Sequence, residues 1–215
     1  MLEVIKTVTG LYCTNSYILR DTLSGECAVI DPGYYDDAYR RFLEENNIGT
    51  VKYILLTHGH FDHICGVPHV KKNFGGDVLI HEEDRICLEN ADYSLTNSVD
   101  GYSQETCTAD RIIADNDEIY LGENKISVMH TPGHTKGSVI FICDGFIFSG
   151  DTLFRGSMGR TDLPGGSTKS IFRSLRAIGQ LQGEYRIFPG HGEETTLSYE
   201  KINNRYLRAN DTTRN

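Results

Sequence analysis

Histidine and aspartate side chains are concentrated in one short stretch of the sequence, residues 57–66. The stretch reads Thr-His-Gly-His-Phe-Asp-His-Ile-Cys-Gly, so three histidines and one aspartate fall within six consecutive residues. Imidazole and carboxylate groups are ligands through which proteins hold zinc, iron and manganese. Ions held in this way can activate a water molecule for attack on a carbonyl group. The stretch therefore predicts a metal site.

An apolar run, residues 51–56, leads directly into this stretch. Such a run is typical of a strand covered on both faces, so the metal-binding stretch begins where that strand ends. Three more candidate ligands follow predicted strands in the same way, and they are His134, Asp151 and His191. A Pro-Gly pair precedes both histidines, and Pro-Gly favours a tight turn after a strand. We therefore expect four strand ends to supply one set of ligands.

The candidate ligands share a position just beyond a strand, and they are His58, His60, Asp62, His63, His134, Asp151 and His191. Residues i and i+2 of an extended segment point the same way, so His58 and His60 can bind one ion. A change of direction after this pair lets Asp62 and His63 face a second ion. Seven ligands exceed the four of a tetrahedral zinc site, which favours two ions. Asp151 is the expected bridge, because a carboxylate can bind two ions through its two oxygens.

The composition favours a soluble protein. A chain of 215 residues can bury a sizeable core without disulfides, and the six cysteines form no Cys-x-x-Cys pair. The net charge of −9 argues against a broad nucleic-acid or anionic-membrane surface. The first residues lack the apolar segment of a signal peptide, and no apolar run approaches the ~20 residues that cross a bilayer. We expect one cytoplasmic domain over residues 1–215, with a small-molecule partner and an oligomeric state that the sequence leaves open.

Two batches of predicted strands, each followed by helices, position the ligand-bearing loops. Periodicity and turn residues predict strands at 3–8, 15–20, 27–31, 51–56, 77–81, 112–114, 118–121, 125–131, 138–143, 146–149 and 186–188. They predict helices at 34–46, from 62 or 63 to 70, at 82–90, from 167 or 168 to 178, and at 193–207. This order predicts an α/β fold of two sheets with helices outside them.

Residues 91–110 are polar and show no clear periodicity, which predicts a surface excursion. Long loops in compact domains often carry binding residues or act as lids. Tyr93 and Tyr102 are therefore candidate substrate contacts.

The motifs together resemble those of the metallo-β-lactamase-fold hydrolase superfamily. They run in order over residues 2–208 and read Thr57-His58-x-His60-x-Asp62-His63, Thr131-Pro132-Gly133-His134-Thr135, Ser149-Gly150-Asp151-Thr152 and Pro189-Gly190-His191. The resemblance implies an αβ/βα sandwich of two mixed sheets with helices outside. It also implies a first ion held by His58, His60 and His134, and a second held by Asp62, His63 and His191. Asp151 would lie between the two ions.

Residues 151–166 resemble the compact glyoxalase II-like, or hydroxyacylglutathione hydrolase-like, group of that superfamily. Glyoxalase II itself carries a C-terminal helical domain, whereas the 24 residues after His191 are enough for one helix. The resemblance implies hydrolysis of acyl thioesters of a small thiol, such as S-D-lactoylglutathione, by a hydroxide between two divalent ions. Zinc is expected, with iron or manganese as alternatives. Asp62 and Asp151 would be the catalytic residues.

Other chemistries remain open on the same residues. The run Gly159-Arg160-Thr161-Asp162 is shared with persulfide dioxygenases, which bind a single iron, so iron-dependent oxidation is the main alternative. Lactonase or phosphodiesterase chemistry at the two-ion site is a third. A β-lactamase is disfavoured because its bridging position is typically Cys or otherwise arranged.

Three basic residues near these motifs could bind an anionic substrate, and they are Arg160, Arg155 and Lys136. An arginine can grip a carboxylate with two parallel hydrogen bonds. Arg160 is favoured because, by the resemblance, glyoxalase II has a basic thiol-binding residue at that position. Asp31, in an Asp-Pro-Gly turn, is expected either to support a metal ligand or to stabilise its own turn.

Overall fold

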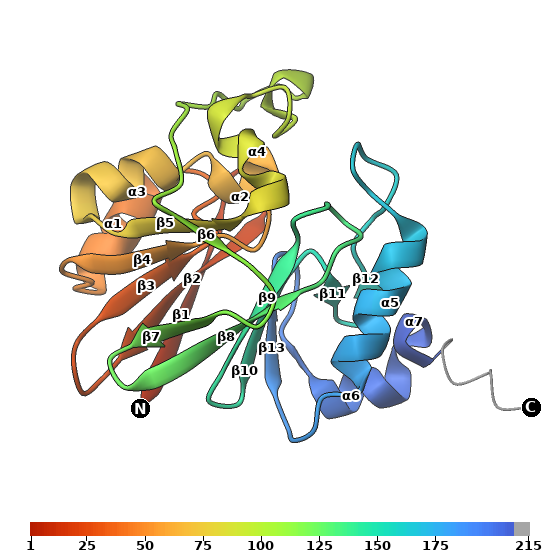
Figure 1. Cartoon of the computed structure of the whole chain (residues 1–215). Helices are drawn as coiled ribbons and strands as arrows, with labels where there is room; N and C mark the ends of the chain where they lie inside the picture. Colours follow the sequence, from red (N-terminus) through yellow and green to blue (C-terminus); the bar gives the residue numbers. More distant parts are fainter. Residues whose placement is uncertain (209–215) are drawn as a thin grey trace, which may run out of the picture.

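The computed structural model describes residues 1–208, in which two six-stranded sheets face each other (Figure 1). The first sheet has the order β1-β2-β3-β4-β5-β6, with bounds Leu2–Thr9, Thr14–Asp21, Cys27–Ile30, Val51–Leu55, Asp77–His81 and Arg111–Ile113. The second has the order β14-β13-β10-β9-β8-β7, with bounds Thr195–Thr196, Arg186–Pro189, Phe146–Gly150, Val139–Cys143, Asn124–His130 and Glu118–Leu121. A separate ribbon pairs β11 (Leu153–Phe154) with β12 (Ser157–Met158).

Helices cover the outer face of each sheet. The first sheet carries α1, α2, α3 and α4, with bounds Asp37–Glu45, Phe61–Ile64, Val67–Phe74 and Ile86–Glu89. Short 3₁₀ turns, η1 and η2, lie at Glu82–Asp84 and Thr96–Ser98. The second sheet carries α5, α6 and α7, with bounds Thr168–Gly179, Leu197–Asn203 and Arg205–Arg208. This helix–sheet–sheet–helix arrangement is the αβ/βα sandwich, so the predicted fold class is confirmed.

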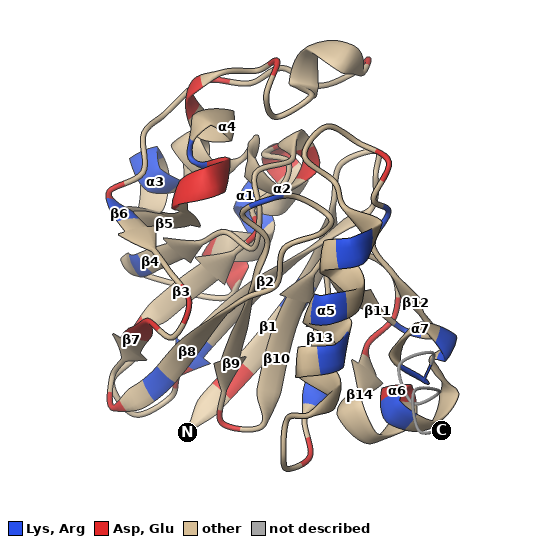
Figure 2. Cartoon of the chain, turned by 45° about the vertical axis from the view of Figure 1, so that its right-hand side comes forward, with Lys and Arg blue, Asp and Glu red and all other residues tan. Residues whose placement is uncertain are grey.

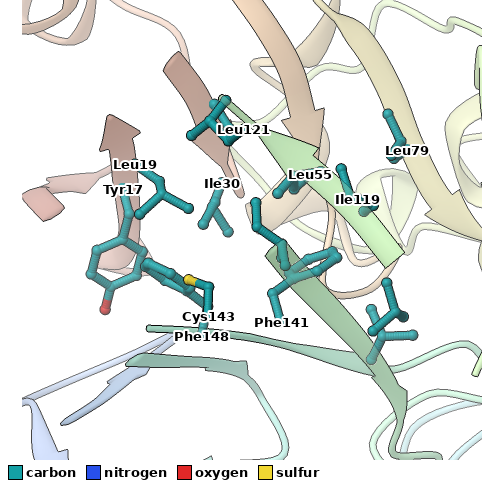
Figure 3. Close-up of a cluster of buried hydrophobic side chains, with 14 of the residues drawn as sticks. Tyr17, Leu19, Ile30, Leu55, Leu79, Ile119, Leu121, Phe141, Cys143 and Phe148 are labelled. Atoms are coloured by element: carbon teal, nitrogen blue, oxygen red, sulfur yellow. The ribbon is translucent and has the colours of Figure 1, made fainter. Parts of the chain in front are cut away.

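The central core lies between the two sheets (Figure 3). Tyr17 and Leu55 of the first sheet face Phe141 and Phe148 of the second. Successive side chains of a strand point to opposite faces, so Ile54 of the same strand packs under the outer helices. The Ile54–Leu55 end of strand β4 is therefore buried on both faces, which explains a sequence that is apolar except at Lys52.

Helix α5 shows how the sequence separates buried from exposed faces. Ser167 caps its first turn by accepting a hydrogen bond from the Ser170 N–H. Ile171 and Leu175 of this helix are buried, whereas Arg173 is exposed in the stripe of basic residues visible in Figure 2. No helix within residues 1–208 is long and apolar enough to cross a membrane.

Three of the predicted helices are wrong in extent. The predicted helix from 62 or 63 to 70 is two helices, α2 and α3, and the second ends at Phe74. The predicted helix 82–90 is split into η1 and α4 because Asp84 turns into the interior, where only 3% of its surface is exposed. The predicted helix 193–207 begins only after β14 and breaks at Asn204, whose backbone is extended. The Asn204 amide group instead donates hydrogen bonds to Ser157 O and Glu200 Oε2, at 2.9 and 2.7 Å. The break thus ties the closing helices to the β11–β12 ribbon.

Candidate metal centre

The seven candidate ligands lie together beyond four strand ends, which belong to β4, β8, β10 and β13. The first loop changes direction as expected. His60 is extended, with φ −71° and ψ 147°, and α2 begins at the next residue. Asp62 and His63 therefore sit on the first turn of a helix, whereas His58 and His60 belong to the extended segment that precedes it.

The ligand atoms form three overlapping groups, in each of which all of them lie within 4.8 Å of one another. The groups are His58 with His60 and His134, Asp62 with His63 and His191, and His58 with His63 and Asp151. The first two groups are those expected from the sequence. The third links them through Asp151. Metal binding by these side chains stays a prediction.

Asp151 lies between the two outer groups. Its Oδ1 is 3.4 Å from His63 Nε2, and its Oδ2 is 3.4 Å from His134 Nε2. Within the outer groups, His60 Nδ1 lies 2.9 Å from His134 Nε2, and Asp62 Oδ2 lies 3.2 Å from His191 Nε2. Asp151 Oδ2 also lies 3.6 Å from His191 Nε2, so the Asp151 carboxylate contacts both outer groups, as a bridging ligand must.

Two buried polar atoms fit a bound cation. Among the described residues, four buried side-chain atoms have no hydrogen-bond partner, and two of them, His58 Nε2 and Asp151 Oδ1, belong to the candidate ligands. A buried polar atom without a partner costs about 1–3 kcal/mol, and interiors normally avoid this cost. Both atoms point into the ligand groups. Coordination of a cation would satisfy them, so the donor set fits divalent metal ions.

Hydrogen bonds on the far side of the His58 and His134 rings fix which nitrogen faces the centre. Thr57 Oγ1 donates to Asp31, so it accepts from His58 Nδ1 at 3.1 Å. His134 Nδ1 donates to Arg160 O at 2.8 Å. In both cases Nε2 is left with its lone pair towards the other ligands. Such outer partners orient metal-binding histidines and raise their basicity.

Asp31 takes the supporting role that was one of its two expected alternatives. Its Oδ2 accepts from His63 Nδ1 at 3.0 Å, and its two oxygens accept from the backbone N–H and hydroxyl of Thr57. Its backbone adopts φ +49°, which Asp and Asn tolerate better than other side chains. One carboxylate therefore orients His63 directly and His58 through Thr57.

We expect Asp31→Asn to weaken metal binding without unfolding the protein. Asn retains the tolerance for positive φ but offers one acceptor oxygen where three donors converge. Loss of such a partner lowers metal affinity about 10- to 100-fold. Competition with a metal-sensitive chelating dye would measure the change. Unaltered affinity would show that Asp31 only stabilises its turn.

The pKa values divide the histidines into neutral and charged rings. Burial, reinforced by neighbouring histidines, lowers the pKa of His60 to about 3 and that of His58 well below its ordinary value. Both rings are neutral at pH 7 and can donate a lone pair. Burial also disfavours charge on His63, but nearby carboxylates, Asp151 foremost, outweigh it and raise the His63 pKa. A cation bound to His63 must displace that proton.

Asp84 supports the candidate ligands, a role that the sequence does not predict. It accepts hydrogen bonds from Gly59 N at 2.9 Å, Thr135 Oγ1 at 2.6 Å and Gly137 N at 2.8 Å. Gly59 lies between His58 and His60, and Thr135 follows His134. One buried carboxylate therefore joins the two loops of the first ligand group. In the sequence Asp84 is the last of three acidic residues and looks like part of an exposed helix start, so no signal marked it.

We expect Asp84→Ala to destabilise the protein by about 3 kcal/mol, because two buried N–H groups and one hydroxyl lose their acceptor. Urea unfolding of the metal-free protein would measure this loss. Glu83→Ala is the matched control, since the neighbouring side chain is exposed. Equal stability of the two variants would contradict the structural role of Asp84.

The three basic candidates lie in different places. Arg160 lines the cavity above the ligands, but its guanidinium already makes two hydrogen bonds of 2.8 Å to Asp162. Arg155 is half exposed, ion-paired with Glu193 and stacked over the Tyr199 ring, away from that cavity. Lys136 lines a second cavity. Their roles in substrate binding stay predictions.

Two cavities meet at His60. One, of about 580 Å³, has five of the candidate ligands in its wall, namely His60, Asp62, His134, Asp151 and His191. The other, of about 530 Å³, contains Tyr93 with Lys136. Tyr102 is placed differently, because its ring packs edge-on against Tyr12 and Phe61. From residues 91–110 the first cavity instead receives Leu95, Ser98 and Val99.

Comparisons with known proteins agree with this geometry. Residues 10–191 match the family model described as Metallo-beta-lactamase superfamily. The chain is 33% identical to hydroxyacylglutathione hydrolase GloC of Haemophilus influenzae over 190 residues, covering 85% of this chain and 87% of that protein.

Two crystal structures are similar over almost their whole length. That of the BLEG-1 B3 metallo-beta-lactamase superposes with a TM-score of 0.89 at 33% identity, covering 95% of this chain and 99% of that one. That of TTHA1623 in a di-iron-bound form gives a TM-score of 0.83 at 32% identity, covering 94% and 99%. The chain therefore belongs to the metallo-beta-lactamase superfamily of metallo-hydrolases.

Proposed function

We propose that the protein is a two-metal hydrolase that cleaves acyl thioesters of a small thiol. The observation that carries the proposal is the pair of ligand groups joined by the two oxygens of Asp151, at 3.4 Å from one histidine of each. The two irons named in the TTHA1623 structure support a centre for two ions. Zinc is the ion we expect, with iron or manganese as alternatives.

The bound ions would supply Lewis acidity, which lowers the pKa of a water molecule and polarises a carbonyl oxygen. The side chains of the protein would hold the reacting groups in position. Asp62 Oδ2 is engaged by Thr14 Oγ1 at 3.1 Å and by His191 Nε2 at 3.2 Å. We propose that this carboxylate orients the attacking water. Asp62 and Asp151 are the residues we propose as catalytic.

The reaction needs no strong general acid. The water oxygen forms a bond to the acyl carbon and the carbon–sulfur bond breaks, which gives a carboxylate and a thiol. A thiolate leaves readily because the pKa of a thiol is about 8.5, and solvent can supply its proton. No histidine of the site therefore has to act as a general acid, which suits buried histidines that already have defined partners. The name of the GloC relative supports a thioester of a small thiol as substrate.

The test is hydrolysis by protein loaded with zinc, iron or manganese, measured with thiol-detecting reagents. We expect thiol release from S-D-lactoylglutathione or from acyl thioesters of other small thiols. Parallel assays with a lactone, a phosphodiester and a β-lactam would reveal a different hydrolase. Oxygen uptake with glutathione persulfide and iron-loaded protein, without thioester hydrolysis, would reject the proposal in favour of a dioxygenase.

A further inference from the structure

The cavity over the ligand groups has an apolar wall. Apart from the five candidate ligands, most of its lining is hydrophobic, and these residues include Tyr12, Leu95, Val99, Phe154, Met158 and Leu163. They come from separate parts of the chain: the β1–β2 loop, residues 91–110, the β11–β12 ribbon and the loop before α5 (Figure 1). The four segments thus form an apolar wall around the five candidate ligands.

The wall of the cavity also carries little charge. Among the described residues that line it, Arg160 is the one arginine or lysine, and Asp162 holds its guanidinium in two hydrogen bonds. Arg160 is also largely solvent-exposed, at 61% of its side chain. The wall therefore offers apolar contact and little unpaired charge to a bound molecule.

Leu95 occupies its place in this wall at a conformational cost. Its backbone has φ +70° and ψ 11°, the left-handed region that a leucine rarely adopts. That conformation costs about 1–2 kcal/mol for a residue with a branched or bulky side chain, whereas Gly or Asn would fit with little strain. Strain of this kind concentrates at binding sites. Position 95 thus carries an apolar side chain although its left-handed backbone would favour Gly or Asn.

We propose that the substrate carries an apolar group of several carbons next to the scissile thioester, and that this group packs against Leu95 and its neighbours. The inference rests on the proposed function and narrows its substrate class. A cavity of about 580 Å³ holds such a group together with the thioester. The apolar group can belong to the acyl part or to the thiol part of the substrate.

A chain-length series separates these two sources. The acyl arm compares acetyl, butanoyl and hexanoyl thioesters of N-acetylcysteamine. The thiol arm compares acetyl thioesters of ethanethiol, butanethiol and hexanethiol. Burial of one CH₂ group favours binding by about fourfold. We expect kcat/KM to rise about fourfold per CH₂ in one arm, and about 250-fold over four CH₂ groups.

Leu95→Asn tests the wall without endangering the fold, because Asn tolerates the left-handed backbone. We expect unchanged or higher Tm and about a tenfold loss of the hexyl-over-ethyl or hexanoyl-over-acetyl preference. Leu23→Asn, at a leucine that is 88% exposed, is the matched control and should keep the preference. Calorimetry gives a second readout, since an unreactive S-hexyl thioether should bind with a more negative heat-capacity change than its S-methyl analogue.

The outcomes distinguish the two proposals. Hydrolysis with flat chain-length dependence in both arms would overturn the apolar substrate while leaving the thioester hydrolase intact. A preference that survives in Leu95→Asn would overturn the role of this wall. No hydrolysis of any thioester, S-D-lactoylglutathione included, would reject the proposed function and with it this inference.

Discussion

Replacing Asp151 with Asn is expected to lower kcat/KM by about 10³-fold, because an ion at a hydrolytic centre contributes several kcal/mol to the reaction. Asn keeps the shape of the side chain but loses its charge, and its amide nitrogen cannot bind a cation. One of the two oxygens that face His63 and His134 is thereby lost. Thioester hydrolysis and metal content, measured on the same preparation, would show whether rate and second ion disappear together.

The control for this variant is Asp37→Asn, at the exposed start of α1, where 85% of the side chain is accessible. It removes the same charge without approaching the centre and should leave both the rate and the metal content unchanged. Full activity of Asp151→Asn with two ions bound would exclude a bridging role for this carboxylate.

Gly190→Ala is expected to disrupt the metal centre, because the added methyl group would collide with two candidate ligands. An added Cβ would lie 2.2 Å from Asp151 Oδ1 and 2.7 Å from His63 Cε1, far inside contact distance. Gly190 is itself held in place, since its N–H donates to Gly150 O at 2.8 Å. Overpacking of this kind costs about 1–3 kcal/mol, and here the atoms that must move are ligands. We expect loss of metal binding and a lower unfolding midpoint in urea.

Gly179→Ala provides the comparison for Gly190→Ala. Gly179 ends α5, and a Cβ there would meet nothing closer than Leu207 Cδ2 at 3.9 Å. Alanine is also the better helix former by about 1 kcal/mol, so stability should rise slightly and metal binding should not change. Normal metal content in Gly190→Ala would mean that the Asp151 carboxylate is less rigidly placed than the contacts indicate.

The clustering of the candidate ligands could be predicted from sequence because it depends on local rules, whereas metal binding by them stays a prediction. Histidines two residues apart on an extended segment share a face, and His134, Asp151 and His191 each directly follow a strand or a Pro-Gly turn. The strands of three or more residues match predicted strands, because their apolar runs reflect burial on one or both faces. The two-residue strands β11, β12 and β14 are too short to give such a pattern. The change of direction at Phe61, which separates His60 from Asp62, was also expected and is the start of α2.

What supports the ligands could not be predicted, because it depends on contacts between distant segments. Asp84 joins loops around residues 59 and 135, and nothing in an acidic triplet foretells that its last member turns inward. Leu95 lies in a polar stretch, residues 91–110, in which the tyrosines were the candidate substrate contacts. The pairing of Arg155 with Glu193, outside the cavity over the ligands, likewise has no signal in the sequence. Side-chain partners of this kind become visible only in three dimensions.

The division of the ligands between two ions is the central claim, and metal content tests it most directly. Elemental analysis would be made on the natural chain and on His191→Ala, each saturated with zinc and freed of excess by gel filtration. We expect about two ions per chain in the natural protein and about one in the variant, which retains His58, His60 and His134. One ion per chain in both proteins would contradict that claim.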